Sequence, residues 1–151
     1  MKPVSAKKLE ELGLEYRLIK LKRRAVSVQD VIDNADDDID PAEICKTILV
    51  KDRAGRMYAV LLRGCDRIDF KKLRKVLGKL SVASREDCGR VAGVEPGAIC
   101  PLTLNIPVYV DEKVLRLESI NFGSGNHLYG IEVRINDLAK MLDFKVLDVA
   151  K

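Results

Sequence analysis

A lysine stands among apolar and β-branched residues in the run Cys45-Lys46-Thr47-Ile48-Leu49-Val50. Such a run predicts a strand that is apolar on both faces, and strand side chains alternate between the faces, so Lys46 shares its face with Ile48 and Val50. Burying a lysine there without a partner costs free energy. We therefore expect Lys46 either to extend into water at the strand end or to point into a site where a cation is useful.

Two glycine-containing loops lie downstream and could complete such a site. They are Gly97-Ala98-Ile99-Cys100-Pro101 and Gly123-Ser124-Gly125-Asn126-His127. Glycine lets backbone N–H groups approach a ligand closely, and proline stiffens the end of a loop. The Gly123-Ser124-Gly125 turn resembles a phosphate-binding nest. Taken alone, Gly97–Pro101 is best interpreted as an ordinary turn, and glycine turns such as Gly123-Ser124-Gly125 are common between strands.

Other side chains near these loops have both a structural and a chemical interpretation. His127 is the only histidine and could act as a general base near neutral pH, but a single histidine is more often structural. Cys100 could touch a substrate, although no histidine is near it in sequence to activate a thiol. Thr47 follows Lys46 directly, so it points to the opposite face and is expected to pack.

Composition narrows the class of protein. The chain has 151 residues, of which 47% are hydrophobic and 33% charged, as in soluble globular domains. No apolar run is long enough to span a membrane, and the first residues lack a signal core, so we expect a cytoplasmic protein. The cysteines are widely spaced, without a CxxC pair, which argues against a zinc site or a disulfide framework: Cys45, Cys65, Cys88 and Cys100.

The net charge of +4 is distributed unevenly along the chain. Basic residues gather at 20–24 and again at 71–79, whereas acidic residues gather at 33–40. Segregated basic surface indicates a polyanionic partner such as nucleic acid. A solvated helix face would give the same pattern.

Periodicity and turn residues predict a mixed order of elements. Helices are expected at 5–12, after a Ser27 cap, at 41–44, at 69–78, after a Ser84 cap and at 136–142. Strands are expected at 15–21, at 47–50 and 57–62 as a hairpin, at 80–83, at 108–110 and 114–117 around a turn, at 128–135 and at 144–149. This predicts one α+β domain over 1–151, with a mixed, mostly antiparallel sheet surrounded by helices.

Four segments, in order, resemble a known family. They are the Pro41–Val50 turn and strand, the helix Asp69–Gly78, the GxxxP loop Gly97–Pro101 before a strand at Pro107–Asp111, and the Gly123-Ser124-Gly125 turn before Ile131-Glu132-Val133 and Asn136-Asp137-Leu138. Over about residues 25–145 the chain resembles the YbaK/ProX-type aminoacyl-tRNA deacylases, free-standing relatives of the editing domain in bacterial prolyl-tRNA synthetases. The resemblance implies a strongly curved sheet.

The resemblance also implies an activity: hydrolysis of the ester that joins a wrong amino acid to the 3′ end of tRNA. Lys46 would anchor the terminal phosphate or ribose and act as the catalytic residue. The backbone of Gly97–Pro101 would hold the aminoacyl group, and the Gly123–His127 turn would close the pocket. Water would be the nucleophile, with no metal or organic cofactor. The sequence does not decide whether the substrate is an alanine, cysteine or serine ester.

The expected partners are the acceptor end of tRNA and a synthetase, with no membrane. A non-catalytic module that binds tRNA or a synthetase is the alternative. The family itself lacks a Ser-His-Asp or Cys-His set. The absence of such a set from this sequence therefore does not separate the enzyme from the binding module.

Overall fold

A β-hairpin forms the centre of the larger sheet. Strands β2 (Cys45–Asp52) and β3 (Met57–Arg63) pair antiparallel, with Leu49 opposite Ala59. The Asp52 carboxylate fixes the turn because it accepts hydrogen bonds from the backbone N–H groups of Ala54 and Arg56 at 2.9 Å. This confirms the predicted hairpin. The computed structural model describes residues 2–36 and 38–151, so Asp37 of the acidic stretch lies outside the described residues.

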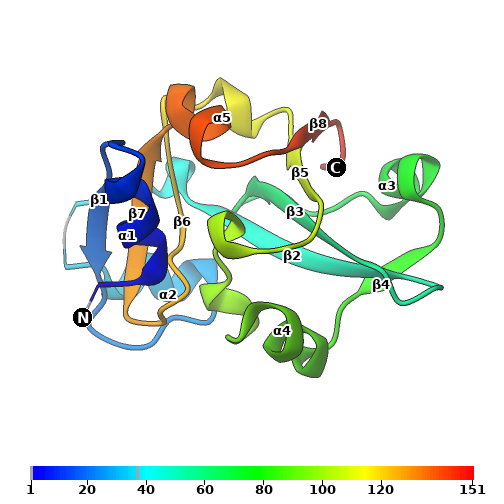
Figure 1. Cartoon of the computed structure of the whole chain (residues 1–151), viewed down its shortest axis with the longest axis horizontal. Helices are drawn as coiled ribbons and strands as arrows, with labels where there is room; N and C mark the ends of the chain where they lie inside the picture. Colours follow the sequence, from blue (N-terminus) through cyan, green and yellow to red (C-terminus); the bar gives the residue numbers. More distant parts are fainter. Residues whose placement is uncertain (1, 37) are drawn as a thin grey trace.

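Within those residues the strands form two sheets, one of five strands and one of three. The larger has the order β4-β2-β3-β5-β8, where β4 is Leu80–Val82, β5 is Val108–Asp111 and β8 is Lys145–Leu147. β4 is antiparallel to β2, whereas β5 runs parallel to both β3 and β8. In Figure 1 this sheet extends from the centre of the molecule toward α3.

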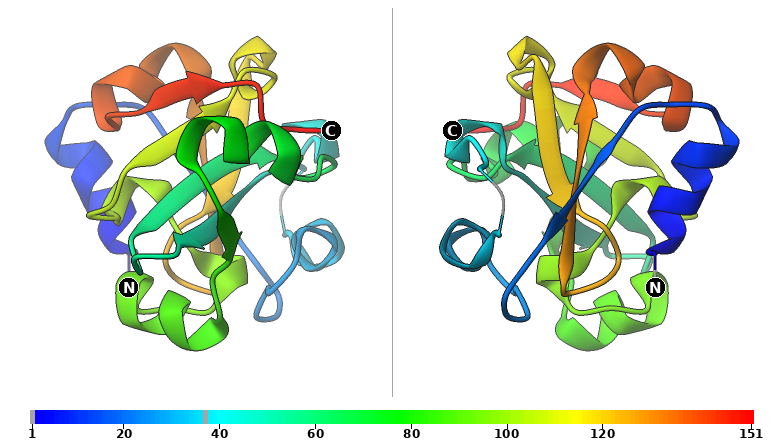
Figure 2. Two further views of the ribbon diagram at one scale, coloured as in Figure 1. Left: turned by 90° about the vertical axis from the view of Figure 1, so that its right-hand side faces the viewer. Right: turned by 90° about the vertical axis from the view of Figure 1, so that its left-hand side faces the viewer.

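The smaller sheet is antiparallel throughout and has the order β1-β7-β6. Its strands are β1 (Arg17–Lys20), β7 (Tyr129–Arg134) and β6 (Ser119–Gly123), and Leu18 faces Ile131 across the first pair. A single bridge between Ile44 and Asn121 joins it to the start of β2. Figure 2 shows the two sheets crossing with their strands strongly twisted. The α+β class and the mixed, mostly antiparallel pairing are confirmed.

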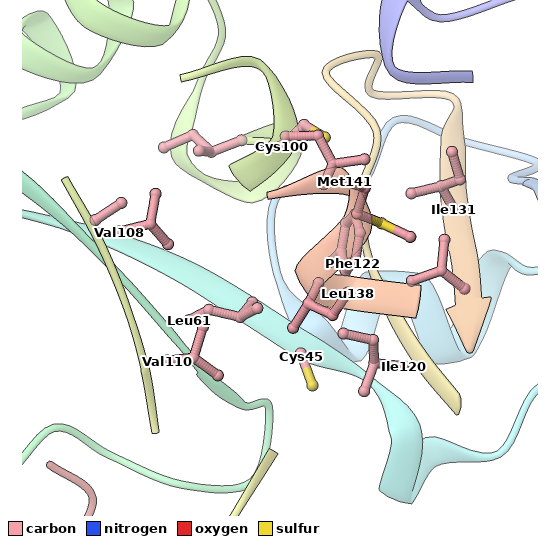
Figure 3. Close-up of a cluster of buried hydrophobic side chains, with 14 of the residues drawn as sticks. Cys45, Leu61, Cys100, Val108, Val110, Ile120, Phe122, Ile131, Leu138 and Met141 are labelled. Carbon is pink, nitrogen blue, oxygen red and sulfur yellow. The ribbon is translucent and has the colours of Figure 1, made fainter. Parts of the chain in front are cut away.

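The main core lies between the two sheets. Leu61 and Val110 of the large sheet meet Ile120, Phe122 and Ile131 of the small one, and all are at most 2% exposed (Figure 3). Burying such a side chain stabilises a fold by about 1.5–3 kcal/mol. A second cluster on the other face of the large sheet joins β2 and β3 to α3 through Leu73. The core thus fixes β2 from both sides.

Five α-helices are present in the described part of the chain: α1 (Val4–Glu11), α2 (Val28–Asn34), α3 (Phe70–Leu77), α4 (Arg85–Ala92) and α5 (Leu138–Met141). The predicted caps Ser27 and Ser84 are confirmed, since their side chains accept hydrogen bonds from the first turns of α2 and α4, and Asp69 caps α3 in the same way. Short 3₁₀ turns are η1 (Pro41–Glu43), η2 (Pro96–Ala98), η3 (Pro101–Thr103), η4 (Val114–Arg116) and η5 (Ile135–Asp137). No helix among the described residues is long and apolar enough to cross a bilayer.

The strand expected at 114–117 is wrong, because this segment forms η4. Both edges of β5 are already occupied by β3 and β8, so no edge is left for a hairpin partner. The buried Asp111 ends β5 by accepting hydrogen bonds from the N–H groups of Val149 and Ala150 at 3.0 and 3.1 Å. Strand β6 was not predicted, and only its last residue, Gly123, was assigned, as the first residue of a turn.

Candidate functional site

A cleft of about 190 Å³ opens beside the first half of β2. β4 pairs only with Val50–Asp52, and the bridge to β6 involves Ile44, so within residues 2–36 and 38–151 the outer edge of Cys45–Leu49 has no strand partner. The cleft occupies this gap. Most of its walls besides β2 come from the segment 25–28 with α2, the η2 loop, the end of β6, and residues 126–130. Further lining residues are Leu21, Val82, Ala83 and Cys88.

Most of the predicted site residues meet in this cleft. Lys46 lines it together with residues of both loops, namely Gly97, Ala98, Ile99, Gly123 and His127. Four predicted residues do not line it: Cys100, Pro101, Ser124 and Gly125. The fold therefore brings one strand and two loops together, as the sequence predicted, while the binding roles assigned to them stay predictions.

Lys46 supplies a cation at the cleft. Its side chain is half-buried, and its Nζ donates to the carbonyl of Gly64 at 3.3 Å. Burial lowers the pKa of this ammonium below its ordinary value, and the negative charge of Asp66 opposes the shift. No carboxylate of the described residues lies within 4.0 Å of Nζ, so the charge is available to a ligand.

The first glycine of each loop packs closely against the backbone of another segment. A β-carbon on Gly97 would lie 2.2 Å from the Cα of Val26, and one on Gly123 would lie 2.7 Å from the carbonyl oxygen of Ile99. Side chains are therefore excluded at both positions by protein backbone. This packing is one physical reason for glycine at position 97, and the contact of its backbone with a ligand stays a prediction.

The rest of the second loop is a buried support. Gly125 has φ +89°, a conformation that favours glycine, and its N–H donates to the carbonyl of Ala98 at 2.8 Å. The Ser124 hydroxyl donates to the carbonyl of Tyr129 at 2.7 Å, and its own carbonyl accepts from Ser5 of α1 at 2.7 Å. These bonds hold the turn against the first loop.

His127 sits at the mouth of the cleft. Its Nδ1 lies 3.3 Å from the carbonyl oxygen of Ala25, and its Nε2 lies 3.3 Å from the guanidinium of Arg24. A carbonyl only accepts and a guanidinium only donates, so these contacts suit a ring with its hydrogen on Nδ1. Arg24 also pairs with Glu95 at 2.8 Å. This arrangement occupies the nitrogen that a general base would use.

The cysteines near the cleft are held as thiols. Burial raises the pKa of Cys45 to about 12 and that of Cys100 to about 11. A thiolate is the nucleophilic form of cysteine, and it is disfavoured at both positions. No group of three His, Cys, Asp or Glu side chains in the described chain could hold a metal ion.

Several cleft residues were missed by sequence reasoning. They include Thr47, Asn121 and Tyr129, together with residues 25–28. Thr47 was assigned to packing because it points away from the face of Lys46. It is indeed 6% exposed, but the cleft follows the strand edge and so reaches residues of both faces. Thr47 can be identified as a cleft residue only from the position of the unpaired edge of β2 in the tertiary structure.

The chain thus has a twisted α+β fold with one cleft that combines the ammonium of Lys46 with apolar walls. The chain belongs to the aminoacyl-tRNA editing domain family, whose model matches residues 24–141.

A proline–tRNA ligase of Caldicellulosiruptor saccharolyticus is 31% identical over 115 residues, which are 75% of this chain and 19% of the ligase. The chain thus spans about a fifth of the length of the curated relatives it matches.

Solved structures share the fold over almost the whole chain. A hypothetical protein superposes with a TM-score of 0.84 at 24% identity, covering 97% of this chain and 98% of that one. A protein proposed to be a trans-editing enzyme for prolyl tRNA synthetase superposes with a TM-score of 0.79 at 20% identity, covering 97% of each chain. The resemblance inferred from sequence motifs is confirmed.

Proposed function

We propose that the protein is a trans-editing hydrolase that deacylates mischarged aminoacyl-tRNA. The observation that carries this proposal is the meeting of Lys46, the η2 loop and the Gly123–His127 turn in one cleft of an editing-domain family member. The proposed partners are the acceptor end of tRNA and a prolyl-type synthetase, because the curated relatives are proline–tRNA ligases. We expect this reaction in the cytoplasm, where tRNA is aminoacylated.

The proposed chemistry is water attack on an activated ester. The water oxygen bonds to the carbonyl carbon, the bond to the ribose oxygen breaks, and a proton from the water ends on that ribose oxygen. Such a reaction needs orientation and charge stabilisation more than a strong nucleophile. Lys46 would place its ammonium near the terminal phosphate or the developing oxyanion. The raised pKa of Cys100 supports water, not a thiolate, as the nucleophile.

The walls of the cleft support a small amino acid. Apolar side chains of Leu49, Cys88 and Phe122 face the cleft, whose volume is about 190 Å³. Alanine, cysteine and serine esters are the proposed substrates. A pocket of this kind discriminates by size, where one methylene is worth about 1–3 kcal/mol.

The test is a deacylation assay over tRNAs charged with alanine, cysteine, serine and proline, using the wild type and Lys46→Ala. We expect hydrolysis of at least one mischarged tRNA and its loss in Lys46→Ala. Lys145→Ala, an exposed lysine of β8 outside the cleft, is the matched control. Binding of tRNA without hydrolysis of any ester would favour the non-catalytic module instead. Full activity of Lys46→Ala would remove the role given to this lysine.

A further inference from the structure

Thr47 holds a buried polar atom that the fold leaves unsatisfied. Its side chain lies on the same face of β2 as Cys45 and Leu49, and the residue is 6% exposed. The Oγ1 atom has no hydrogen-bond partner among the described residues, and it is the one buried side-chain oxygen or nitrogen of that part of the chain in this condition. Folding an unpaired hydroxyl into the interior costs free energy, so a function is a natural reason for it.

The backbone of Thr47 also faces the cleft. In an antiparallel strand, alternate residues direct both their N–H and C=O groups to the same neighbour. The carbonyl of Leu49 points outward, since it accepts from the N–H of Ala83 at 2.9 Å. Thr47 lies two residues away and therefore directs its own peptide groups to the same edge, where β2 has no strand partner.

Thr47 is a polar residue surrounded by apolar residues of the cleft wall. The cleft-lining neighbours on this face are Cys88, Ile99 and Phe122, all buried. Lys46 points to the opposite face, and its Nζ is directed to Gly64. One strand thus presents a cation on one side and two oxygen acceptors, the hydroxyl and carbonyl of Thr47, on the other.

We propose that Thr47 binds the α-ammonium group of the aminoacyl ester through its hydroxyl and carbonyl oxygens. This inference rests on the proposed function. An ammonium has three N–H donors diverging from one atom, which suits two acceptors of a single residue. The carbonyl oxygen of Thr47 cannot hydrogen-bond to the ester or phosphate oxygens of the substrate, because all of these oxygens only accept. The separation from Lys46 keeps the two cations on different faces of β2.

The subsite selects a substrate class. It accepts esters of a free amino acid and rejects esters whose nitrogen is acylated, since acylation removes the charge and two of the three donors. Peptidyl-tRNA and N-formylated aminoacyl-tRNA would therefore be spared, whatever their side chain. This selection is independent of the size discrimination exerted by the apolar walls.

The experiment compares Thr47→Val and Thr47→Ser with the wild type on alanyl-tRNA, seryl-tRNA and N-acetylalanyl-tRNA. We expect Thr47→Val to lower kcat/KM at least tenfold and equally on both free-amine esters, mainly by raising KM. Thr47→Ser keeps the hydroxyl and should retain most activity. The wild type should hydrolyse the N-acetyl ester at least a hundredfold more slowly than alanyl-tRNA. Thr103→Val, an exposed threonine outside the cleft, should behave as wild type.

Thermal melts exclude unfolding as the cause. Thr47→Val removes an unsatisfied hydroxyl while keeping the shape of the side chain, so its Tm should equal or exceed that of the wild type. The inference is overturned if Thr47→Val keeps full activity, if it loses activity on seryl-tRNA alone, or if the wild type hydrolyses the N-acetyl ester equally well. A wild type inactive on every ester would overturn the proposed function itself.

Discussion

Gly97 lies against the backbone of Val26 so closely that a β-carbon would stand 2.2 Å from the Cα of Val26. The same segment is tied to the second loop, because the N–H of Ala25 donates to the carbonyl of His127 at 3.1 Å. Residues 24–26 therefore fasten both loops of the cleft at once. We therefore expect a change in this segment to alter the shape of the cleft.

Gly97→Ala is expected to displace Val26 and to reduce both stability and activity. Forcing an extra carbon into packed backbone costs about 1–3 kcal/mol, which lowers Tm by several degrees in a domain of this size. Gly89→Ala is the control, since Gly89 is in α4 with nothing within 4 Å of a β-carbon, and helix propensity predicts a gain of about 0.5–1 kcal/mol. Melting curves and KM should be measured for both. An unchanged Tm with a raised KM in Gly97→Ala would show that the glycine faces substrate instead.

The activity that depends on Lys46 should fall at alkaline pH. Burial lowers the pKa of its ammonium from the ordinary 10.5, so the folded protein releases this proton at a lower pH than the unfolded chain does. Binding of a non-hydrolysable amide analogue of alanyl-adenosine should weaken as pH rises through that lowered pKa. Lys46→Met should keep or raise Tm at neutral pH, because it removes the cost of burying a charge. Binding that does not change up to pH 10.5 would contradict a role for the charge.

Salt dependence should locate the surface that contacts tRNA. Lys20, Lys22 and Arg23 are exposed, and Leu21 and Ala25 of the same segment line the cleft. Affinity for tRNA should fall with salt with a log–log slope of about 0.7–0.9 per phosphate contacted. Charge reversal at Lys22 and Arg23 should reduce this slope.

Charge reversal at Lys71 and Lys75 of α3 provides the comparison. Helix α3 packs on the other face of the large sheet, away from the small sheet in Figure 1, yet its lysines are exposed as well. A smaller change in slope is expected there. Equal slopes in both variants and the wild type would show that neither basic cluster contacts tRNA and that both are solvated surface.

Ser124→Ala should affect stability more than substrate binding. The buried hydroxyl bonds to Tyr129, and its loss leaves that carbonyl unsatisfied at a cost of about 1–3 kcal/mol. The expected result is a lower Tm, with KM near the wild-type value at temperatures well below the transition. Ser5→Ala, which removes the bond from α1, should act in the same direction. A normal Tm combined with a raised KM would restore Ser124 to the substrate-binding residues.

Local signals predicted much of the fold. The caps at Ser27 and Ser84 and the turn at Asp52 depend on hydrogen bonds within a few residues, so sequence alone identifies them. The error at 114–117 had a non-local cause. Whether an apolar segment after β5 pairs with it depends on strands more than thirty residues away, which had already taken both edges.

In the site, too, the features set by nearby residues were predicted, whereas those set by distant residues were not. Lys46 and the two glycine loops were found because their residue types are unusual where they stand. Thr47 was missed because it lines the cleft only as a result of β4 ending its pairing with β2 at Val50. No residue near Thr47 in the sequence indicates where that pairing ends. The packing of Gly97 against Val26 was not predicted for a related reason, since these two residues lie far apart in the chain.

The pairing of β1 with β7 constrains the order in which the molecule can be assembled. Arg17 and Glu132 are joined across this pair although 115 residues separate them in sequence. On a ribosome, the first strand must therefore leave the exit tunnel long before its partner is synthesised. The hairpin of β2 and β3 can form early, whereas β1 and the segment 24–26 find their partners only after residues 127–134 have been made. The cleft is thus completed only after β7 has been synthesised, and contacts of such long range favour slow folding.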